Sequence, residues 1–142
     1  MTPNQVKTVQ DSFAKVVPIS DQAAALFYSQ LFTIAPPLKS LFRGDMHEQG
    51  RKLMATLAVV VNGLGNLESI LPAASALAKR HVGYGVTAAH YEPVGAALLW
   101  TLERGLGASW TPELAAAWTE AYATVSSYMI AEAYGTNQVA AE

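Results

Sequence analysis

Apolar residues recur every three or four positions along almost the whole chain, with polar residues between them. Near the start, for example, Val9, Phe13 and Val16 fall on one stripe, which stops at Pro18. This spacing matches the roughly 3.6 residues per turn of an α-helix, and no segment alternates with period two for long enough to predict a strand. The pattern therefore predicts an all-α protein with about six substantial helices and one short turn.

Capping residues, prolines and glycines set the expected boundaries in the first half of the chain. The first helix should end before Pro18, and the second should begin at a cap on Ser20 or Asp21 and continue to about Thr33. A short helical turn is expected from the proline pair at 36–37 to about residues 43–44. A long helix should then cover about residues 46–64.

The same signals predict three helices in the second half. Pro72 can open a helix that runs to His81 or Val82, where glycines at 83 and 85 break it. Thr87 could cap the next helix, which should reach about residue 106. The last helix has the clearest start, with Thr111 at the cap and a proline behind it, and should continue to about residue 133.

Three polar residues stand at unusual places in these helices. Tyr28 lies among apolar neighbours, Gln49 falls only about 40° from the apolar stripe through Leu53, and His81 closes a helix. Each has an ordinary structural explanation: a core tyrosine, a capping or solvated glutamine, and a histidine that favours the helix dipole. No one of them alone indicates a functional site.

Taken together, these residues resemble a globin. The chain is similar to bacterial single-domain globins and to the haem domain of flavohaemoglobins, and the matching segments cover nearly all of it. The segments are LFYSQLF (26–32), LKSLF (38–42), QGRKLM (49–54), KRHVGYGV (79–86), HYEPVGAALL (90–99) and AAWTEAY (116–122), with Trp118 in the last. The resemblance implies a globin fold around a haem pocket.

The resemblance also implies roles for particular residues. His81 matches the proximal histidine that binds haem iron, Tyr28 and Gln49 match the distal pair beside the bound gas, and Phe42 matches the aromatic residue against the porphyrin. Further haem-lining positions are Leu53, Leu57, Leu77, Val86, Tyr91 and Val94, with Lys52 and Arg80 expected near the propionates.

Two site assignments stay open at this stage. The segment RGDMHE before Gln49 is about three residues shorter than in typical flavohaemoglobins, so His47 competes with Gln49 for the distal position. The late glutamate that bonds the proximal tyrosine and histidine in flavohaemoglobins would fall on Ala133. Its neighbour Glu132 is rotated by about 100° from that position.

Composition narrows the function classes. With 142 residues we expect a single globin domain over residues 1–142 and no reductase domain. The net charge of −2 gives no electrostatic case for nucleic acid or a membrane surface, and the absence of cysteine excludes thiolate metal sites and a catalytic thiol. Neither a signal peptide nor a membrane-length apolar run is present, so we expect a cytoplasmic protein.

We therefore expect a globin with haem b that binds dioxygen reversibly and with high affinity. Its other small ligands would be nitric oxide and carbon monoxide, and an external reductase could support a nitric oxide dioxygenase activity. The alternatives are a gas-sensing or redox-regulatory globin that acts through a partner protein, and a helical interaction module without haem. The expected oligomeric state is a monomer or a weak homodimer.

Overall fold

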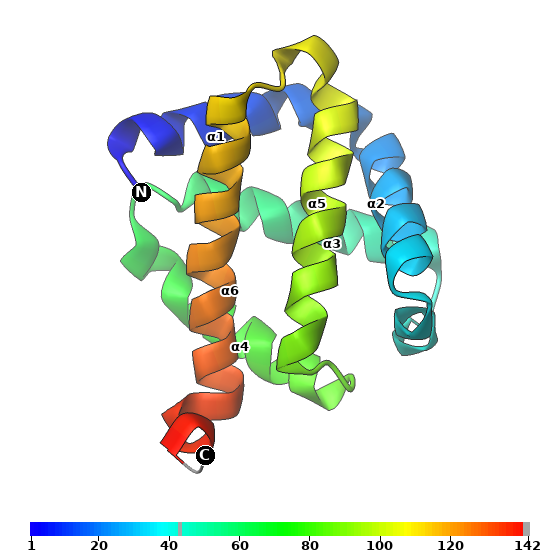
Figure 1. Cartoon of the computed structure of the whole chain (residues 1–142), viewed down its shortest axis with the longest axis vertical. Helices are drawn as coiled ribbons and strands as arrows, with labels where there is room; N and C mark the ends of the chain where they lie inside the picture. The colour runs from blue at the N-terminus through cyan, green and yellow to red at the C-terminus, as the bar shows by residue number, and fades with distance from the viewer. Residues whose placement is uncertain (43, 141–142) are drawn as a thin grey trace.

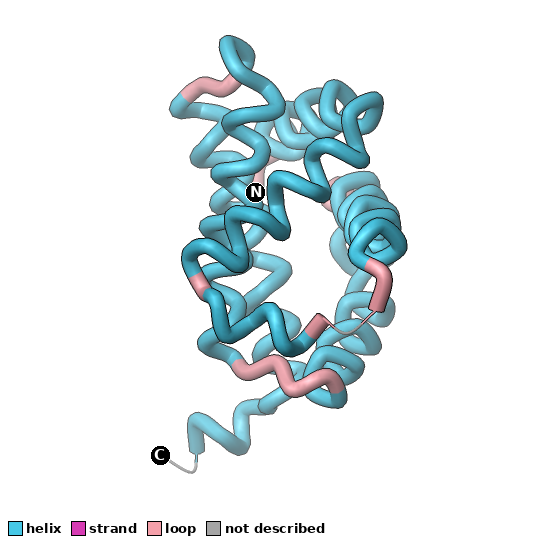
Figure 2. Tube along the Cα trace, turned by 90° about the vertical axis from the view of Figure 1, so that its right-hand side faces the viewer, coloured by secondary structure: helices cyan, strands magenta, loops and turns pink. Residues whose placement is uncertain are grey.

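The structure, a computed structural model, describes the chain at residues 1–42 and 44–140, with side chains up to Tyr134. Its α-helices are α1 (Pro3–Val16), α2 (Ser20–Ile34), α3 (Met46–Asn62), α4 (Leu67–Gly83), α5 (Tyr91–Leu106) and α6 (Pro112–Ala140). Four 3-10 turns join them: η1 (Val17–Ile19), η2 (Pro36–Leu41), η3 (Ala88–His90) and η4 (Gly107–Ser109). The predicted all-α class is confirmed, and Figure 2 shows helices with only short loops between them in the described part of the chain.

The predicted start and cap hold at α6, whereas α2 begins near its predicted start without the predicted cap. At α6 the Thr111 hydroxyl accepts a hydrogen bond from the Leu114 amide at 3.1 Å, as a capping threonine should. At α2 the predicted cap is wrong, because the Ser20 hydroxyl donates to the carbonyl of Val17 at 2.5 Å instead. The η1 turn leads directly into α2, so its carbonyl competes for the hydroxyl. The end predicted for the turn near Arg43 lies outside the described residues.

The start predicted for α4 at Pro72 is also wrong. The helix begins at Leu67, and Pro72 lies inside it. The buried side chain of Ile70 explains the earlier start, since it packs against the corner between α3 and α4. A Cβ atom on Gly63 would lie 2.1 Å from Ile70 Cγ2, so only glycine permits this contact. Packing at the corner outweighs the local preference of proline for a first turn.

In Figure 1, α5 and α6 run side by side, and α1 and α3 cross them. Helix α2 packs against both α3 and α5, while α1 packs against α6. Helix α4 packs mainly against the second half of α6. Buried polar contacts fix the crossings: the Trp118 indole donates to the Ser12 hydroxyl at 2.9 Å, and the Gln10 amide donates to the Val61 carbonyl at 3.0 Å.

The buried core falls into two clusters rather than one. We call the larger one the main cluster; it gathers side chains of α1, α2, α3, α5 and α6 around Val9, Leu31, Leu98 and Trp118. We call the smaller one the α4 cluster; it consists of Ala74, Ala78, Tyr91 and Met129, with partly buried apolar neighbours. Consequently α3 and α4 bury their apolar faces in different clusters, although they follow one another in the sequence.

Among the described helices, none combines the length and the apolar character needed to cross a lipid bilayer.

Candidate functional site

An aromatic group on α2 and the segment after η2 forms one wall of the candidate site. Tyr28 is 8% exposed, and its ring lies 5.3 Å from that of Phe42 in an edge-to-face arrangement. Phe32 completes the contact, with ring centroids 6.0 Å from Tyr28 and 5.5 Å from Phe42. Such pairs stabilise one another beyond their buried area, so they fix the direction of the Tyr28 hydroxyl.

Tyr28 and Gln49 come together in the structure. Burial raises the pKa of Tyr28 to about 12, and the Gln49 side chain beside the hydroxyl opposes that shift. The approach is close because Gly50 faces α2: a Cβ atom there would lie 2.8 Å from Ala24 Cβ. At neutral pH the phenol therefore keeps its proton and can donate a hydrogen bond.

His47 lies closer to the surface. Its side chain is 65% exposed, and its Nε2 atom lies 3.9 Å from Asp21 Oδ1 at the surface. Its backbone amide is held by the Asp45 carboxylate at 3.0 Å, which caps α3. Of the two residues that competed for the distal position, Gln49 has its side chain beside the Tyr28 hydroxyl, whereas His47 lies near Asp21 and lines the same side of the molecule as Tyr28.

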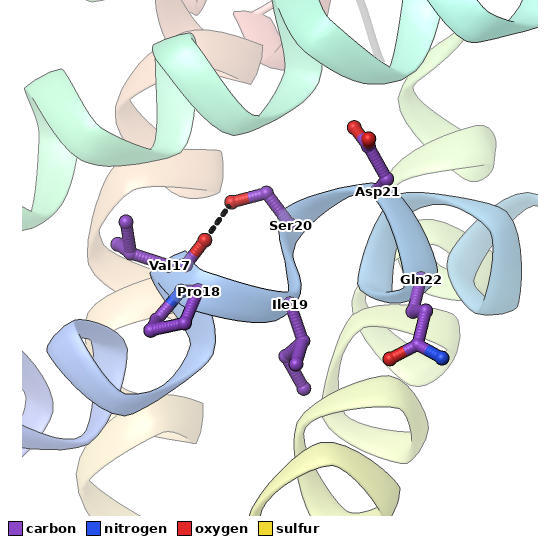
Figure 3. Close-up of a pocket in the computed structure, with 6 residues that line it drawn as sticks. All are labelled: Val17, Pro18, Ile19, Ser20, Asp21 and Gln22. Carbon is purple, nitrogen blue, oxygen red and sulfur yellow. Dashed lines mark hydrogen bonds between the residues drawn. The ribbon is translucent and has the colours of Figure 1, made fainter.

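A cavity of about 330 Å³ lies between α2 and α3 on this side. Its lining residues are Asp21, Ala24, Ala25, Tyr28, Phe32, Met46, His47 and Gly50. A second hollow of similar volume, drawn in Figure 3, is formed by the consecutive residues Val17–Gln22. The side chains of that second hollow splay apart, and only the first cavity touches a predicted site residue.

His81 lies at the other wall, on the last turn of α4. Its ring stacks near that of Tyr91, with centroids 6.4 Å apart and an angle of 26° between the planes. Burial lowers the pKa of His81 and Arg80 adds to the effect, while the Leu77 carbonyl one turn earlier opposes it. A neutral imidazole is the form that binds a metal.

Two buried polar atoms at this wall have no hydrogen-bond partner among the described residues: His81 Nδ1 and the Tyr91 hydroxyl oxygen. The Leu77 carbonyl does not satisfy Nδ1 with ordinary hydrogen-bond geometry. A buried group left unpaired costs stability, so such a pair needs an explanation. Histidines that bind metals use one ring nitrogen for the metal and orient the other through a neighbour.

The loop after α4 brings the two walls together. The Val86 amide donates to the His81 carbonyl at 3.0 Å, and Gly85 has a φ of 93°, which favours glycine. A Cβ atom on Gly85 would lie 3.4 Å from Leu41 Cδ2, next to Phe42. The segment that carries Phe42 is therefore adjacent to the loop that follows His81.

The remaining predicted contacts lie at the margins of the two clusters. Leu53, Leu57 and Val94 are half-buried against the main cluster, whereas Leu77 and Val86 are half-buried against the α4 cluster. On α3, only Gly50 and Val61 are fully buried, so its apolar stripe is incompletely covered. Lys52 and Arg80 are exposed.

These observations fit a flat apolar cofactor with an acidic edge. Insertion between the clusters would cover the half-buried leucines and valines, and it would give the neutral imidazole of His81 a metal partner. The exposed cations could meet acidic groups at the rim. The residues present therefore fit a haem.

Glu132, the acidic residue left open on the proximal side, is engaged elsewhere. Its Oε1 atom accepts a hydrogen bond from the buried Ser75 hydroxyl at 2.7 Å. Ala133 occupies the neighbouring position, which packs against the α4 cluster. Among the described residues, no carboxylate therefore bonds the Tyr91 hydroxyl.

The sequence-based interpretation missed several supporting residues. The Tyr122 hydroxyl donates to the Tyr91 carbonyl at 2.6 Å, and the Tyr134 hydroxyl donates to the Val86 carbonyl. The His90 Nδ1 atom accepts a hydrogen bond from the Thr87 amide at 3.0 Å and closes a capping box. The threonine three residues before His90 was the available signal for this last contact.

Comparison with known proteins gives the same class. The globin family profile matches residues 25–129. Over 107 residues, or 73% of this chain, the sequence is 32% identical to a flavohemoprotein of Bordetella parapertussis and 30% identical to one of Halalkalibacterium halodurans. The chain spans about a quarter of those relatives, 27% and 26% of their lengths.

Solved structures agree on the fold. An engineered carbene transferase made from a putative nitric oxide dioxygenase of Rhodothermus marinus superposes with a TM-score of 0.86 at 25% identity, covering 100% of this chain and 99% of that one. A bacterial globin from Campylobacter jejuni gives 0.83 at 23% identity, covering 96% and 99%, and bears on the fold alone. The chain belongs to the globin family, whose members bind haem.

Proposed function

We propose that this globin holds haem b through His81 and binds dioxygen reversibly and tightly beside Tyr28 and Gln49. The observation that carries the proposal is the divided core, with an unpartnered imidazole on one side and a buried phenol–amide pair on the other. When bound, haem supplies an iron with one open coordination position for a diatomic ligand.

The residues around the pocket would make this binding selective. Tyr28 keeps its proton because its pKa is about 12, so it donates to a ligand that carries partial negative charge. Such a donor contributes on the order of 1–3 kcal/mol in a pocket shielded from water. Dioxygen gains from it more than carbon monoxide does, and Phe42 with the α3 leucines would exclude water.

Charged side chains at the rim of the pocket would help to orient the cofactor. Lys52 and Arg80 are exposed on α3 and α4 and would pair with the propionates in solvent, where each pair adds only about 0–1 kcal/mol. His81 and the apolar margins of the two clusters would contribute most of the affinity for haem.

Replacing His81 by Ala tests the proposal. The five-coordinate ferrous spectrum of the wild-type protein should disappear, and added imidazole should restore it by occupying the vacated position. His47→Ala is the matched control, because this exposed histidine should leave the spectrum unchanged. A wild-type protein that refuses added hemin, or an unchanged spectrum in His81→Ala, would contradict the proposal.

We propose nitric oxide dioxygenation as a second activity, supported by likeness to flavohemoproteins and to the putative nitric oxide dioxygenase. One nitric oxide, one dioxygen and one electron from an external reductase would give one nitrate. The oxygenated protein should lose its spectrum on mixing with nitric oxide and complete many turnovers when a reductant is supplied. Consumption of a single equivalent would argue against catalysis.

A further inference from the structure

The His81–Tyr91 pair is the least satisfied polar feature among the described residues. Both His81 Nδ1 and the Tyr91 hydroxyl are buried without a partner, and their rings stack. Among the described residues, no carboxylate bonds either atom of this pair.

The nearest carboxylate on this stretch of α6 is committed to another group. Glu132 accepts from Ser75 at 2.7 Å, and the Tyr128 phenol lies beside the same carboxylate. Ser75 is buried on α4, so the bond links α4 to α6. Releasing Glu132 would leave a buried hydroxyl unpaired, which costs on the order of 1–3 kcal/mol.

Ala133 stands at the position from which an acceptor could reach the pair. This alanine packs against the α4 cluster, which contains Tyr91. It is half-buried and has no polar atom in its side chain. Adjacent helical residues diverge by about 100°, so Glu132 and Ala133 cannot both face the cluster.

We propose that the proximal imidazole of this globin works without a charged hydrogen-bond acceptor, because Glu132 is held by Ser75 and Ala133 supplies none. An acceptor on the second nitrogen makes an imidazole a stronger electron donor to a bound metal. His81 is accordingly a weak electron donor, which suits reversible ligand binding. The inference rests on the proposed haem site.

The experiment uses the haem-loaded protein and two readouts other than activity. Resonance Raman spectroscopy gives the iron–histidine stretching frequency of the ferrous form, and a redox titration gives the midpoint potential. Glu132→Gln should change neither. Ala133→Glu should raise the frequency and lower the potential, because it places a carboxylate beside the pair, and Ala133→Gln should produce a clearly smaller shift.

Each outcome decides the question. A shift in Glu132→Gln would overturn the inference, since the native carboxylate would then already act on His81. A folded, haem-loaded Ala133→Glu with wild-type values would overturn it as well. If Ala133→Glu fails to bind haem, the frequency and the potential of Glu132→Gln still test the inference. A wild-type protein that binds no haem refutes the proposed function instead, so the two failures are distinguishable.

Discussion

The phenol of Tyr28 can stabilise a bound ligand only while it keeps its proton. Its surroundings ensure this, because burial among Phe27, Phe32 and Phe42 raises the pKa by about two units from 10.0 to about 12. The shift implies stability that is present below pH 10 and is lost as the pH rises toward 12, where the buried phenol ionises. Near neutral pH the hydrogen bond from Tyr28 is thus independent of pH.

Tyr28→Phe removes the hydroxyl and keeps the ring. The dissociation rate of dioxygen should rise roughly five- to a hundred-fold, the equivalent of 1–3 kcal/mol, at every pH from about 6 to 9. Stopped-flow displacement of dioxygen by carbon monoxide measures the rate. Tyr84→Phe is the control, because Tyr84 is 61% exposed and should leave the rate unchanged. Equal rates in wild type and Tyr28→Phe would show that the hydroxyl does not reach the ligand.

Gln49→Leu and His47→Leu separate the two residues near the start of α3. The Gln49 side chain meets the Tyr28 hydroxyl, whereas His47 lies by Asp21 in solvent. Dioxygen should therefore dissociate several-fold faster from Gln49→Leu and at the wild-type rate from His47→Leu. The reverse result would move the distal role to His47.

The sequence could predict that Gln49 faces the core, but it could not predict every polar contact near the site. The stripe through Leu53 places Gln49 toward the core, since helical geometry alone sets that angle. The bond from Ser75 to Glu132 spans 57 positions along the chain, and no local pattern specifies it. Ser20 was misjudged as a cap because its hydroxyl bonds the Val17 carbonyl, which only the assembled η1 turn brings within reach.

At the scale of elements, the α2–α3 crossing sets the distal geometry. Ala24 and Gly50 meet there with no space for another methyl group. Tyr28 lies one turn after Ala24 on α2, and Gln49 immediately precedes Gly50 on α3. The sequence predicted both helices correctly. The start of α4 was predicted wrongly. Pro72 suggested that the helix begins there, but it begins five residues earlier, at Leu67, where Ile70 is buried.

Gly50→Ala should destabilise the protein although alanine favours a helix by about 1 kcal/mol over glycine. The new Cβ would lie 2.8 Å from Ala24 Cβ, so the helices must separate. Urea unfolding should show a lower midpoint, and dioxygen should leave faster because Tyr28 and Gln49 move apart. Gly105→Ala is the control, since its Cβ would make an ordinary 3.4 Å contact with Ile19.

The double variant Ala24→Gly with Gly50→Ala tests the cause. It moves the methyl group from α2 to α3 and restores the close approach, so the midpoint should recover most of the loss, less the cost of glycine within α2. If the double variant is no more stable than Gly50→Ala, the loss of stability in Gly50→Ala does not come from the contact with Ala24 at the α2–α3 crossing.

At the scale of the whole molecule, the division of the core predicts which parts need the cofactor. The main cluster is completed by the chain itself, through buried contacts such as Trp118 with Ser12 and Phe13. In contrast, α3 presents a half-buried stripe, and α4 rests mainly on α6. Without haem, α3 and α4 lack part of the burial that stabilises the other helices.

Removal of haem should therefore affect the helices unequally. Amide hydrogen exchange of the apoprotein should be much faster in α3 and α4 than in the haem-loaded protein, whereas α1, α5 and the first turns of α6 should keep most of their protection. Thermal unfolding should shift upward with hemin concentration, since a ligand that binds only the folded state stabilises it by mass action. His81→Ala with and without imidazole provides the control, because protection of α4 should follow occupancy of the iron position. Uniform loss of protection across all helices would mean that the two clusters unfold as one unit, and that the cofactor stabilises the whole core rather than the space between its halves.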